Sequence, residues 1–344
     1  MHDDPAVSSL SPHSAQPHAI SIVIPVFNGE LTLAPLVAEI AQLTKPSSSP
    51  MGHSWIVKEV LLVFDNGSDK SDATIRALDN QYSFVRPIWL SRNFGQHSAT
   101  LAGMSSTVSE WIVTMDEDRQ HDPRDIGILL DAALRTRSPL VYAKPTNTPP
   151  HGWLRNTASR SAKTIMSTLL PDKSALQYQS FRLVLGEIGR SVAAYAGAGV
   201  YLDVALGWIV SSVATADVEF RADNSRASGY SLGSLLSHFW RLVLSSGTKA
   251  LRVVSILGAI SALAGFGLGV YFIIERSLGG NLPAGWTSTI TVILFSNGVI
   301  LMAMGIIAEY LGVAVNMAMG KPRYLIVSDP ADGPLQRAER ADNL

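Results

Sequence analysis

Two long stretches without a charged residue constrain this chain more than any other feature. They run from Val253 to Ile274 and from Trp286 to Ala308, and are 22 and 23 residues long. A helix of about 20 apolar residues can cross the hydrocarbon core of a bilayer, which is about 30 Å thick. Two such stretches in tandem predict a transmembrane helical hairpin rather than two buried helices of a soluble protein.

The basic residues around these stretches predict their orientation. Only Arg276 lies in the connection between them, whereas Arg241, Lys249 and Arg252 precede the first stretch and Lys321 and Arg323 follow the second. Because basic residues favour the cytoplasmic side, we expect both flanks in the cytoplasm. Residues 1–19 lack the apolar core of a signal peptide, so the N-terminal region is expected there too.

These boundaries divide the chain into five segments. We expect a disordered tail over 1–19, a cytoplasmic domain over 20–229, a juxtamembrane helix over 230–250, two membrane helices within 251–310 and a cytoplasmic tail over 311–344. The juxtamembrane helix is indicated by apolar residues at helical spacing, namely Leu232, Leu235, Leu236, Phe239 and Val243. They fit an amphipathic helix in the membrane interface, and a core-facing helix is the alternative.

Composition excludes several classes of protein. The net charge of −1 does not fit a uniformly basic nucleic-acid-binding protein. The chain has no cysteine, which excludes disulfides, a cysteine-ligated zinc site and a thiol nucleophile. Any anion must therefore be bound by local clusters of basic side chains.

The first half of the chain alternates between two patterns. Five short apolar runs predict strands, at Ile20–Phe27, Ile56–Phe64, Val85–Leu90, Trp111–Met115 and Leu140–Ala143. Segments with helical periodicity lie between them, including 33–43 and 126–133. This alternation predicts an α/β domain with a mostly parallel sheet, whose ligands bind beyond the carboxyl ends of the strands.

Four successive predicted strands end in polar or acidic residues, more than turns alone require. Any one of these ends alone could be a turn. After the fourth strand, Asp116 and Asp118 stand two residues apart, and Gln120 adds an amide oxygen. Such oxygen ligands suit Mg²⁺ or Mn²⁺ bound together with substrate phosphates, and solvated acids at a loop mouth are the alternative.

The segments SIVIPVFNGE, LVFDNGSDKSDAT, LSRNFGQHSATLAGM and WIVTMDEDRQHDP resemble the family 2 glycosyltransferases of the GT-A fold. The third segment, together with Gly305–Gly312 and Lys321–Tyr324, resembles the polyprenyl-phosphate branch of that family. The resemblance implies a Rossmann-like GT-A catalytic domain that moves a sugar from a nucleotide diphosphate to a polyprenyl phosphate such as undecaprenyl phosphate, with inversion. It also implies a bacterial plasma-membrane location, a role in cell-envelope glycan assembly, and a homo-oligomer such as a tetramer.

The resemblance further implies roles for individual residues. A nucleotide-sugar pocket would be lined by Pro25, Asn28, Glu30, Asp65, Asn66, Arg92, Asn93 and Asp116. The metal would be held by Asp116, Asp118 and Gln120, and the catalytic residues would be Asp116, Asp118 and Arg182. The acceptor phosphate would be bound by Lys144, Arg155, Arg160, Arg182, Arg226, Ser228 and Tyr230. Ser180 stands where the family has an aspartate.

Two other functions are compatible with the same fold. A processive polysaccharide synthase would need a Gln-x-x-Arg-Trp segment, which is missing from this sequence, and usually more membrane helices. A membrane-tethered protein that binds a sugar nucleotide without turnover is the other alternative, because Asn66 and Ser180 depart from the family pattern.

Overall fold

The computed structural model describes residues 16–147, 179–197, 200–221 and 285–333, and single positions between 258 and 278. Nine strands in this part form one sheet in the order β8-β6-β7-β5-β1-β3-β4-β9, with β2 paired to β3. Their bounds are β1 His18–Val26, β2 Ser47–Ser48, β3 Ser54–Phe64, β4 Val85–Leu90, β5 Trp111–Thr114, β6 Leu140–Pro145, β7 Arg182–Leu185, β8 Val213–Val218 and β9 Ile326–Val327.

The central strand β1 runs parallel to both of its neighbours. Ile22 pairs with Val60 of β3 on one side and with Val113 of β5 on the other. Residues 20–26 of β1 are all buried, as expected for a strand covered on both faces. All five predicted strands are confirmed within two residues of their predicted bounds.

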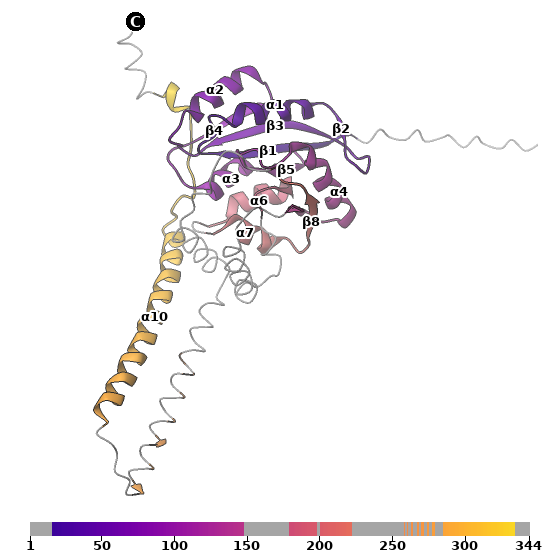
Figure 1. Cartoon of the computed structure of the whole chain (residues 1–344). Coiled ribbons are helices and arrows are strands. Elements are labelled where there is room, and N and C mark those ends of the chain that lie inside the picture. Colours follow the sequence, from indigo (N-terminus) through magenta and orange to yellow (C-terminus); the bar gives the residue numbers. More distant parts are fainter. Residues whose placement is uncertain are drawn as a thin grey trace, which may run out of the picture.

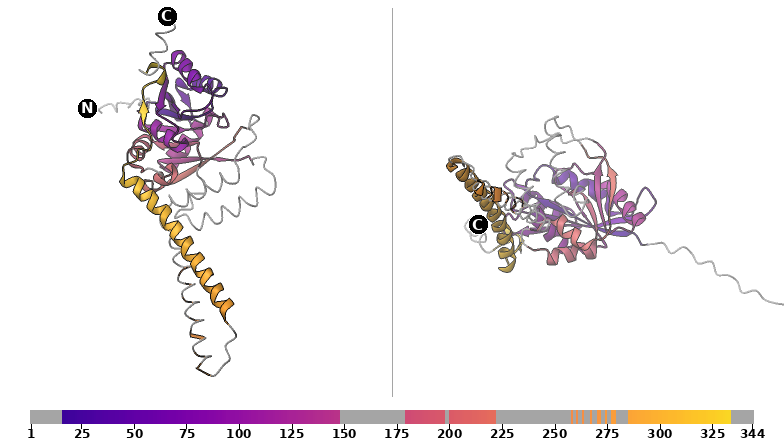
Figure 2. Two further views of the ribbon diagram at one scale, coloured as in Figure 1. Left: turned by 90° about the vertical axis from the view of Figure 1, so that its left-hand side faces the viewer. Right: turned by 90° about the horizontal axis from the view of Figure 1, so that it is seen from below.

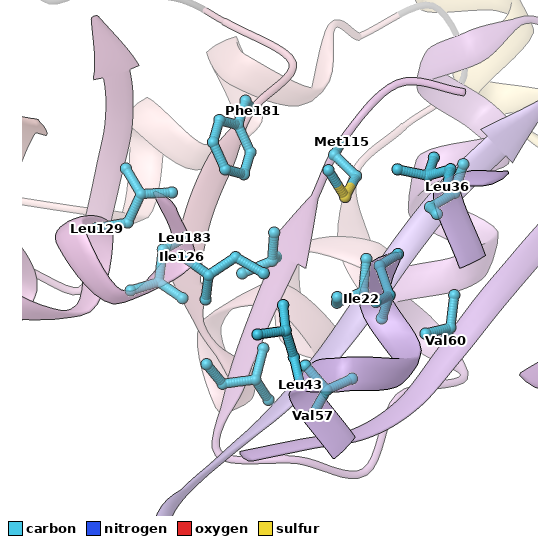
Figure 3. Packing of buried hydrophobic residues seen from close by; sticks show 14 of the residues in the cluster. Ile22, Leu36, Leu43, Val57, Val60, Met115, Ile126, Leu129, Phe181 and Leu183 are labelled. Atoms are coloured by element: carbon cyan, nitrogen blue, oxygen red, sulfur yellow. The ribbon is translucent and has the colours of Figure 1, made fainter. Parts of the chain in front are cut away.

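Helices cover both faces of the sheet (Figure 1). Their bounds are α1 Leu33–Ala41, α2 Ser71–Gln81, α3 Gln96–Ser105, α4 Ile126–Thr136, α6 Gly186–Tyr195 and α7 Leu202–Ile209. One core layer joins the sheet to α1, α2 and α4, and Figure 3 shows part of it, including Ile22, Leu36 and Phe181. The second layer lies between the sheet and helices α3, α6 and α7.

Strand β7 departs from the parallel pattern. It is antiparallel to both β5 and β6, so Arg182 lies between Thr114 of β5 and Tyr142 of β6. The sequence did not predict β7 or β8, because each is short and carries polar residues such as Arg182 or Thr215. The sheet is therefore mixed, with parallel strands at its core and the antiparallel strand β7 between β5 and β6.

Helix α10, Trp286–Ala318, extends away from this domain as a long rod (Figure 2). Its segment Phe295–Ala318 is the one helix in the described residues that is long and apolar enough to cross a membrane; it has a mean hydropathy of 2.0 and is not buried. The helix continues ten residues past the predicted stretch, through Glu309, and ends before Gly320, whose φ is +65°.

The first predicted membrane stretch and the juxtamembrane helix fall largely outside the described residues. The described positions between 258 and 277 are helical. The segments predicted over 1–15 and 230–250, and the last residues from 334, also lie outside them. The predicted domain boundaries therefore stay predictions.

After α10 the chain returns to the α/β domain and completes the edge of the sheet (Figure 1). Strand β9 pairs antiparallel with β4, and the Ser91 amide donates to the Leu325 carbonyl at 3.0 Å. Beyond it, Asp329 accepts from Nε and Nη2 of Arg76 on α2 at 2.7 and 2.8 Å. We call residues 321–333 the C-terminal strap, because they tie the end of α10 to the outer strand of the sheet.

Candidate active site

The loops after β1, β3, β4 and β5 meet at the carboxyl edge of the parallel strands, as the sequence predicts. Asp116 follows β5 and lies at the centre of this edge. Its Oδ1 accepts a hydrogen bond from Gln96 Nε2 at 2.6 Å, and its Oδ2 accepts one from Ser180 Oγ at 2.5 Å. The β5 loop, helix α3 and the start of β7 thus converge on one carboxylate.

A pocket of about 250 Å³ opens beside Asp116. Its lining comes from β1, α3, β5, β7 and α7, and includes Pro25, Gln96, Asp116, Ser180 and Arg182. Burial raises the pKa of Asp116, while the Ser180 hydrogen bond and the charge of Arg182 act in the opposite direction. The pocket therefore combines a carboxylate at one wall with a guanidinium at another.

Arg182 is held rigidly at the floor of this pocket. It is 4% exposed, its Nε donates to Thr114 Oγ1 at 3.0 Å, and its Nη1 is ion-paired with Asp203 of α7. Asp203 also accepts a hydrogen bond from the Tyr142 hydroxyl at 2.8 Å. The sequence predicted Arg182 but not Asp203. Asp203 meets Arg182 only because β7 runs antiparallel to its neighbours.

Glu117, between the two aspartates, ties the β5 loop to the loop after β1. It accepts hydrogen bonds from the amides of Phe27 and Asn28 at 3.1 and 2.9 Å. A Cβ at Gly67 would lie 1.5 Å from the Phe27 carbonyl oxygen, so only glycine fits where the β3 loop crosses the β1 loop. These contacts shape the region where a nucleotide was predicted to bind.

Asp65, at the end of β3, positions the loop after β4. It is 3% exposed and accepts from the amides of Phe94 and Gly95 at 2.7 and 2.8 Å. Burial raises its pKa despite these bonds. The next residue, Asn66, has a φ of +52° and donates to the Leu90 carbonyl at 2.6 Å. Both predicted nucleotide-binding residues thus have a structural contact of their own.

His121, which the sequence did not single out, is a buried residue of the loop after β5. We call this loop, residues 116–125, the acidic loop. His121 is 3% exposed, lies stacked on Phe181 at 5.0 Å between ring centroids, and contacts Phe220 edge-on. Its Nδ1 accepts a long hydrogen bond from the Asp116 amide at 3.4 Å. Burial lowers the pKa of His121 to about 4, so the ring is neutral at pH 7.

A second set of charges anchors the far end of the same loop. Glu39 of α1 accepts from Arg119 at 2.7 Å and from Arg221 at 2.8 Å. Arg221 also pairs with Asp122 at 2.8 Å. This network lowers the pKa of Glu39 and holds the loop between 116 and 125 to helix α1 and to the end of β8.

The acidic loop offers an oxygen donor set that suits a divalent cation. No group of three or more histidine or acidic side chains is arranged to hold a metal within the described residues. Two carboxylates are sufficient for Mg²⁺, which keeps several water ligands and binds substrate phosphates. The two hydrogen bonds to Asp116 leave lone pairs on its oxygens for a metal ion, and Asp118 is only partly buried. These residues therefore fit a divalent cation.

The other predicted residues lie around this edge or outside the described part. The Glu30 carboxylate accepts from the Lys70 amide at 3.2 Å, and Arg92 lies over the Phe94 ring at 4.2 Å beside exposed Asn93. Lys144, at the end of β6, pairs with Asp217 at 3.1 Å. The structure does not describe Arg155, Arg160, Arg226, Ser228 and Tyr230.

Sequence comparison agrees with this architecture. The family model of glycosyl transferase family 2 matches residues 21–191, which include the parallel strands and the acidic loop. The chain thus carries a family 2 glycosyltransferase domain, and its sheet is of the GT-A type. This class of enzyme transfers sugars, which confirms the prediction of a glycosyltransferase.

Two curated relatives match along nearly the whole chain. An undecaprenyl-phosphate 4-deoxy-4-formamido-L-arabinose transferase of Edwardsiella ictaluri is 28% identical over 311 residues, covering 89% of this chain and 93% of its own length. A bactoprenol glucosyl transferase of Shigella phage SfX is 26% identical, covering 90% of this chain and 99% of its own.

A solved structure also aligns with the chain. Glucosyl-3-phosphoglycerate synthase from Mycobacterium tuberculosis, in complex with Mn²⁺, UDP and glucosyl-3-phosphoglycerate, is 16% identical, with a TM-score of 0.48. The match covers 67% of this chain and 80% of that one.

Proposed function

We propose that this protein transfers a sugar from a nucleotide diphosphate to a polyprenyl phosphate at the cytoplasmic face of a bacterial plasma membrane. The relatives that match along nine-tenths of the chain carry names of undecaprenyl-phosphate or bactoprenol transferases. Their similarity extends past the catalytic domain into the region of α10, as expected if the acceptor is a membrane lipid.

The acceptor itself supplies the nucleophile. The second pKa of a phosphate monoester is near 6, so at neutral pH its oxygen is ionised and needs no side-chain base. The protein must bring two anions close together, the acceptor phosphate and the donor diphosphate. Arg182 contributes fixed positive charge at the pocket floor, and Lys144 stands at the neighbouring strand end, where its bond to Asp217 is exposed and exchangeable.

The acidic loop serves the donor side of the reaction. Asp116 and Asp118, with Gln120, would hold Mg²⁺ or Mn²⁺, which would neutralise charge on the departing diphosphate. Pro25, Asn28 and the loops after β3 and β4 would enclose the nucleoside. Attack from the face opposite the diphosphate inverts the anomeric carbon.

Helix α10 supports the membrane placement. Its exposed apolar surface has no counterpart within the described domain to cover it. We propose that α10 and the stretch 253–274 form a hairpin, with the catalytic domain and both termini in the cytoplasm. A homo-oligomer, such as a tetramer, fits the glycine-rich first stretch and is tested by the mass of the detergent-solubilised protein.

One observation carries the proposal: Asp116, Ser180 and Arg182 line one pocket at the carboxyl edge of a family 2 domain. The test is to incubate the full-length protein in detergent with polyprenyl phosphate, Mg²⁺ or Mn²⁺ and a mixture of nucleotide sugars. Mass spectrometry of the lipid fraction should show one hexose or related sugar added per polyprenyl phosphate, and repeating the reaction with each nucleotide sugar alone would identify the sugar.

The same assay separates the alternatives. A processive synthase would give a polymer and leave polyprenyl phosphate unmodified. A protein that only binds sugar nucleotides would give neither lipid product nor donor hydrolysis, and either result would overturn the proposal.

A further inference from the structure

A second pocket, of about 460 Å³, lies where α10 meets the catalytic domain. Its walls come from the end of α6 at Tyr195 and Gly197, from Met317 in the last turn of α10, and from the start of the C-terminal strap at Lys321 and Arg323. No residue of the active-site pocket contributes to it. We call it the strap pocket.

The charged side chains in the described lining of the strap pocket are both basic. Lys321 and Arg323 line it, and its lining in the described structure contains no acidic residue. Arg323 Nη2 donates to the carbonyls of Ala193 and Ala194 at 2.9 and 3.1 Å, which fixes the guanidinium against the end of α6. Its Nη1 is buried and has no hydrogen-bond partner among the described residues. A buried donor without a partner is costly, and an anionic oxygen would satisfy it.

The two cations are not needed to cap the helix. The carbonyls of Val315, Asn316 and Met317 already accept backbone hydrogen bonds from the amides of residues 319–321. The Lys321 side chain is exposed. Burial lowers the pKa of Arg323, and a bound anion would offset that cost. Lys321 and Arg323 are thus available to a ligand.

The position of the pocket indicates where this anion comes from. Residues 295–318 of α10 expose an apolar surface, and the pocket begins at the C-terminal end of that surface, where Lys321 and Arg323 follow. If α10 crosses the bilayer, as proposed above, the pocket lies at the level of the lipid headgroups. Met317 and Pro322 add apolar wall area next to the two cations, which suits a phosphate attached to a hydrocarbon chain.

We propose that the strap pocket binds the phosphate headgroup of a membrane lipid. A phosphodiester of an anionic phospholipid and the phosphate of a polyprenyl phosphate share this chemistry. The proposal rests on the membrane placement given above and does not depend on sugar transfer. Bound lipid would hold the strap, and with it the edge strand β9 and its neighbour β4, at a set distance from the bilayer.

The test measures bound lipid directly. Full-length protein in detergent is titrated with phosphatidylglycerol and, separately, with polyprenyl phosphate, and native mass spectrometry counts the lipids retained. Lys321→Gln should weaken retention about fivefold, the effect of one basic residue at a membrane surface. Lys45→Gln removes an equally exposed charge beside α1 and should leave retention unchanged. Arg323→Lys, which keeps the charge but not the forked geometry, should also weaken it.

Each outcome decides the proposal. Loss of lipid retention in Lys321→Gln and Arg323→Lys, but not in Lys45→Gln, supports the proposal. The lipid whose retention falls more is the source of the bound phosphate. Equal retention in all variants, equal loss in Lys45→Gln, or occupation by inorganic phosphate as tight as by lipid overturns the proposal. An enzyme without transferase activity could still pass this test, so its result is separate from that of the transfer assay.

Discussion

At the scale of single residues, neighbouring carboxylates of the acidic loop have different hydrogen-bond partners. Glu117 points to the amides of the β1 loop, and Asp116 is shared between Gln96 and Ser180. Ser180, which stands where the sequence resemblance leads us to expect an aspartate, donates a hydrogen bond to Asp116 rather than repelling it. A second acid at that position would raise the pKa of Asp116 further.

Asp118→Ala should abolish metal-dependent sugar transfer. Removing a group that stabilises a charged leaving group costs about a hundredfold or more in kcat. The lipid-linked product is measured in detergent over a series of Mg²⁺ and Mn²⁺ concentrations. Asp79→Asn, on the exposed face of α2, should behave as wild type. Full activity of Asp118→Ala at every metal concentration would disprove the metal assignment.

Asp125 should make the fold less stable as the pH rises. Burial and the charge of Asp122 raise the pKa of Asp125 to about 6. The folded chain therefore holds this proton more tightly than the unfolded chain, whose aspartates titrate near 4, and stability falls between about pH 4 and pH 6.

Asp125→Asn should remove this effect. At pH 7 we expect a gain of about 1 kcal/mol after allowance for partial exposure, or about 2–4 °C in Tm. At pH 4 the variant and the wild type should melt together. Asp125 makes no side-chain cap bond to α4, so the replacement costs no cap. A gain that persists at pH 4 would contradict the assignment of the effect to this titration.

At the scale of elements, the C-terminal strap joins helix α10 to the sheet. Arg76 is its main anchor: it lies over the Trp89 ring at 4.9 Å and binds Asp329 with two nitrogens. β9 pairs with β4, and Ser91 at the end of β4 also binds the strap, so the strap contacts the strand that leads into the loop carrying Arg92 and Asn93.

Asp329→Asn should loosen this strap. The change removes a part-buried ion pair worth about 1 kcal/mol, so hydrogen exchange at Ile326 and Val327 should be about fivefold faster. Asp72 binds the same Arg76 from within α2, at 2.7 Å. Asp72→Asn is therefore the matched control, and it should leave exchange in β9 unchanged. Equal acceleration by both variants would contradict the assignment of the effect to the Arg76–Asp329 bond.

At the scale of the whole molecule, the absence of cysteine allows the topology to be measured directly. Single cysteines at Ser48, Ser277 and Ser328, all exposed, report on the catalytic domain, the connection between the membrane stretches and the strap. In intact cells a membrane-impermeant maleimide should label only Ser277→Cys. The other two variants should react after permeabilisation.

The labelling experiment also has a clear negative outcome. Reaction of Ser328→Cys in intact cells would mean that α10 crosses the bilayer without a returning partner. Reaction of Ser277→Cys only after permeabilisation would mean that the stretch 253–274 does not cross.

The sequence alone determined the parts of this protein that depend on local periodicity. Alternating apolar runs specified the five parallel strands, because burial on both faces demands β-branched and aliphatic residues. Periodicity and composition also predicted the long apolar helix α10, since an apolar segment of that length has few stable environments. The acidic edge could also be predicted, because the carboxyl ends of parallel strands meet.

Only the tertiary structure decided which side chains at that edge bind one another. Asp203 reaches Arg182, and Ser180 reaches Asp116, because β7 runs antiparallel between β5 and β6, and no local pattern encodes that direction. The Arg76–Asp329 bond joins positions 253 residues apart, and β9 pairs Val327 with Trp89 of β4, which is also distant along the chain. Such contacts depend on the packing of the whole chain, whereas periodicity reports only which face of an element is buried.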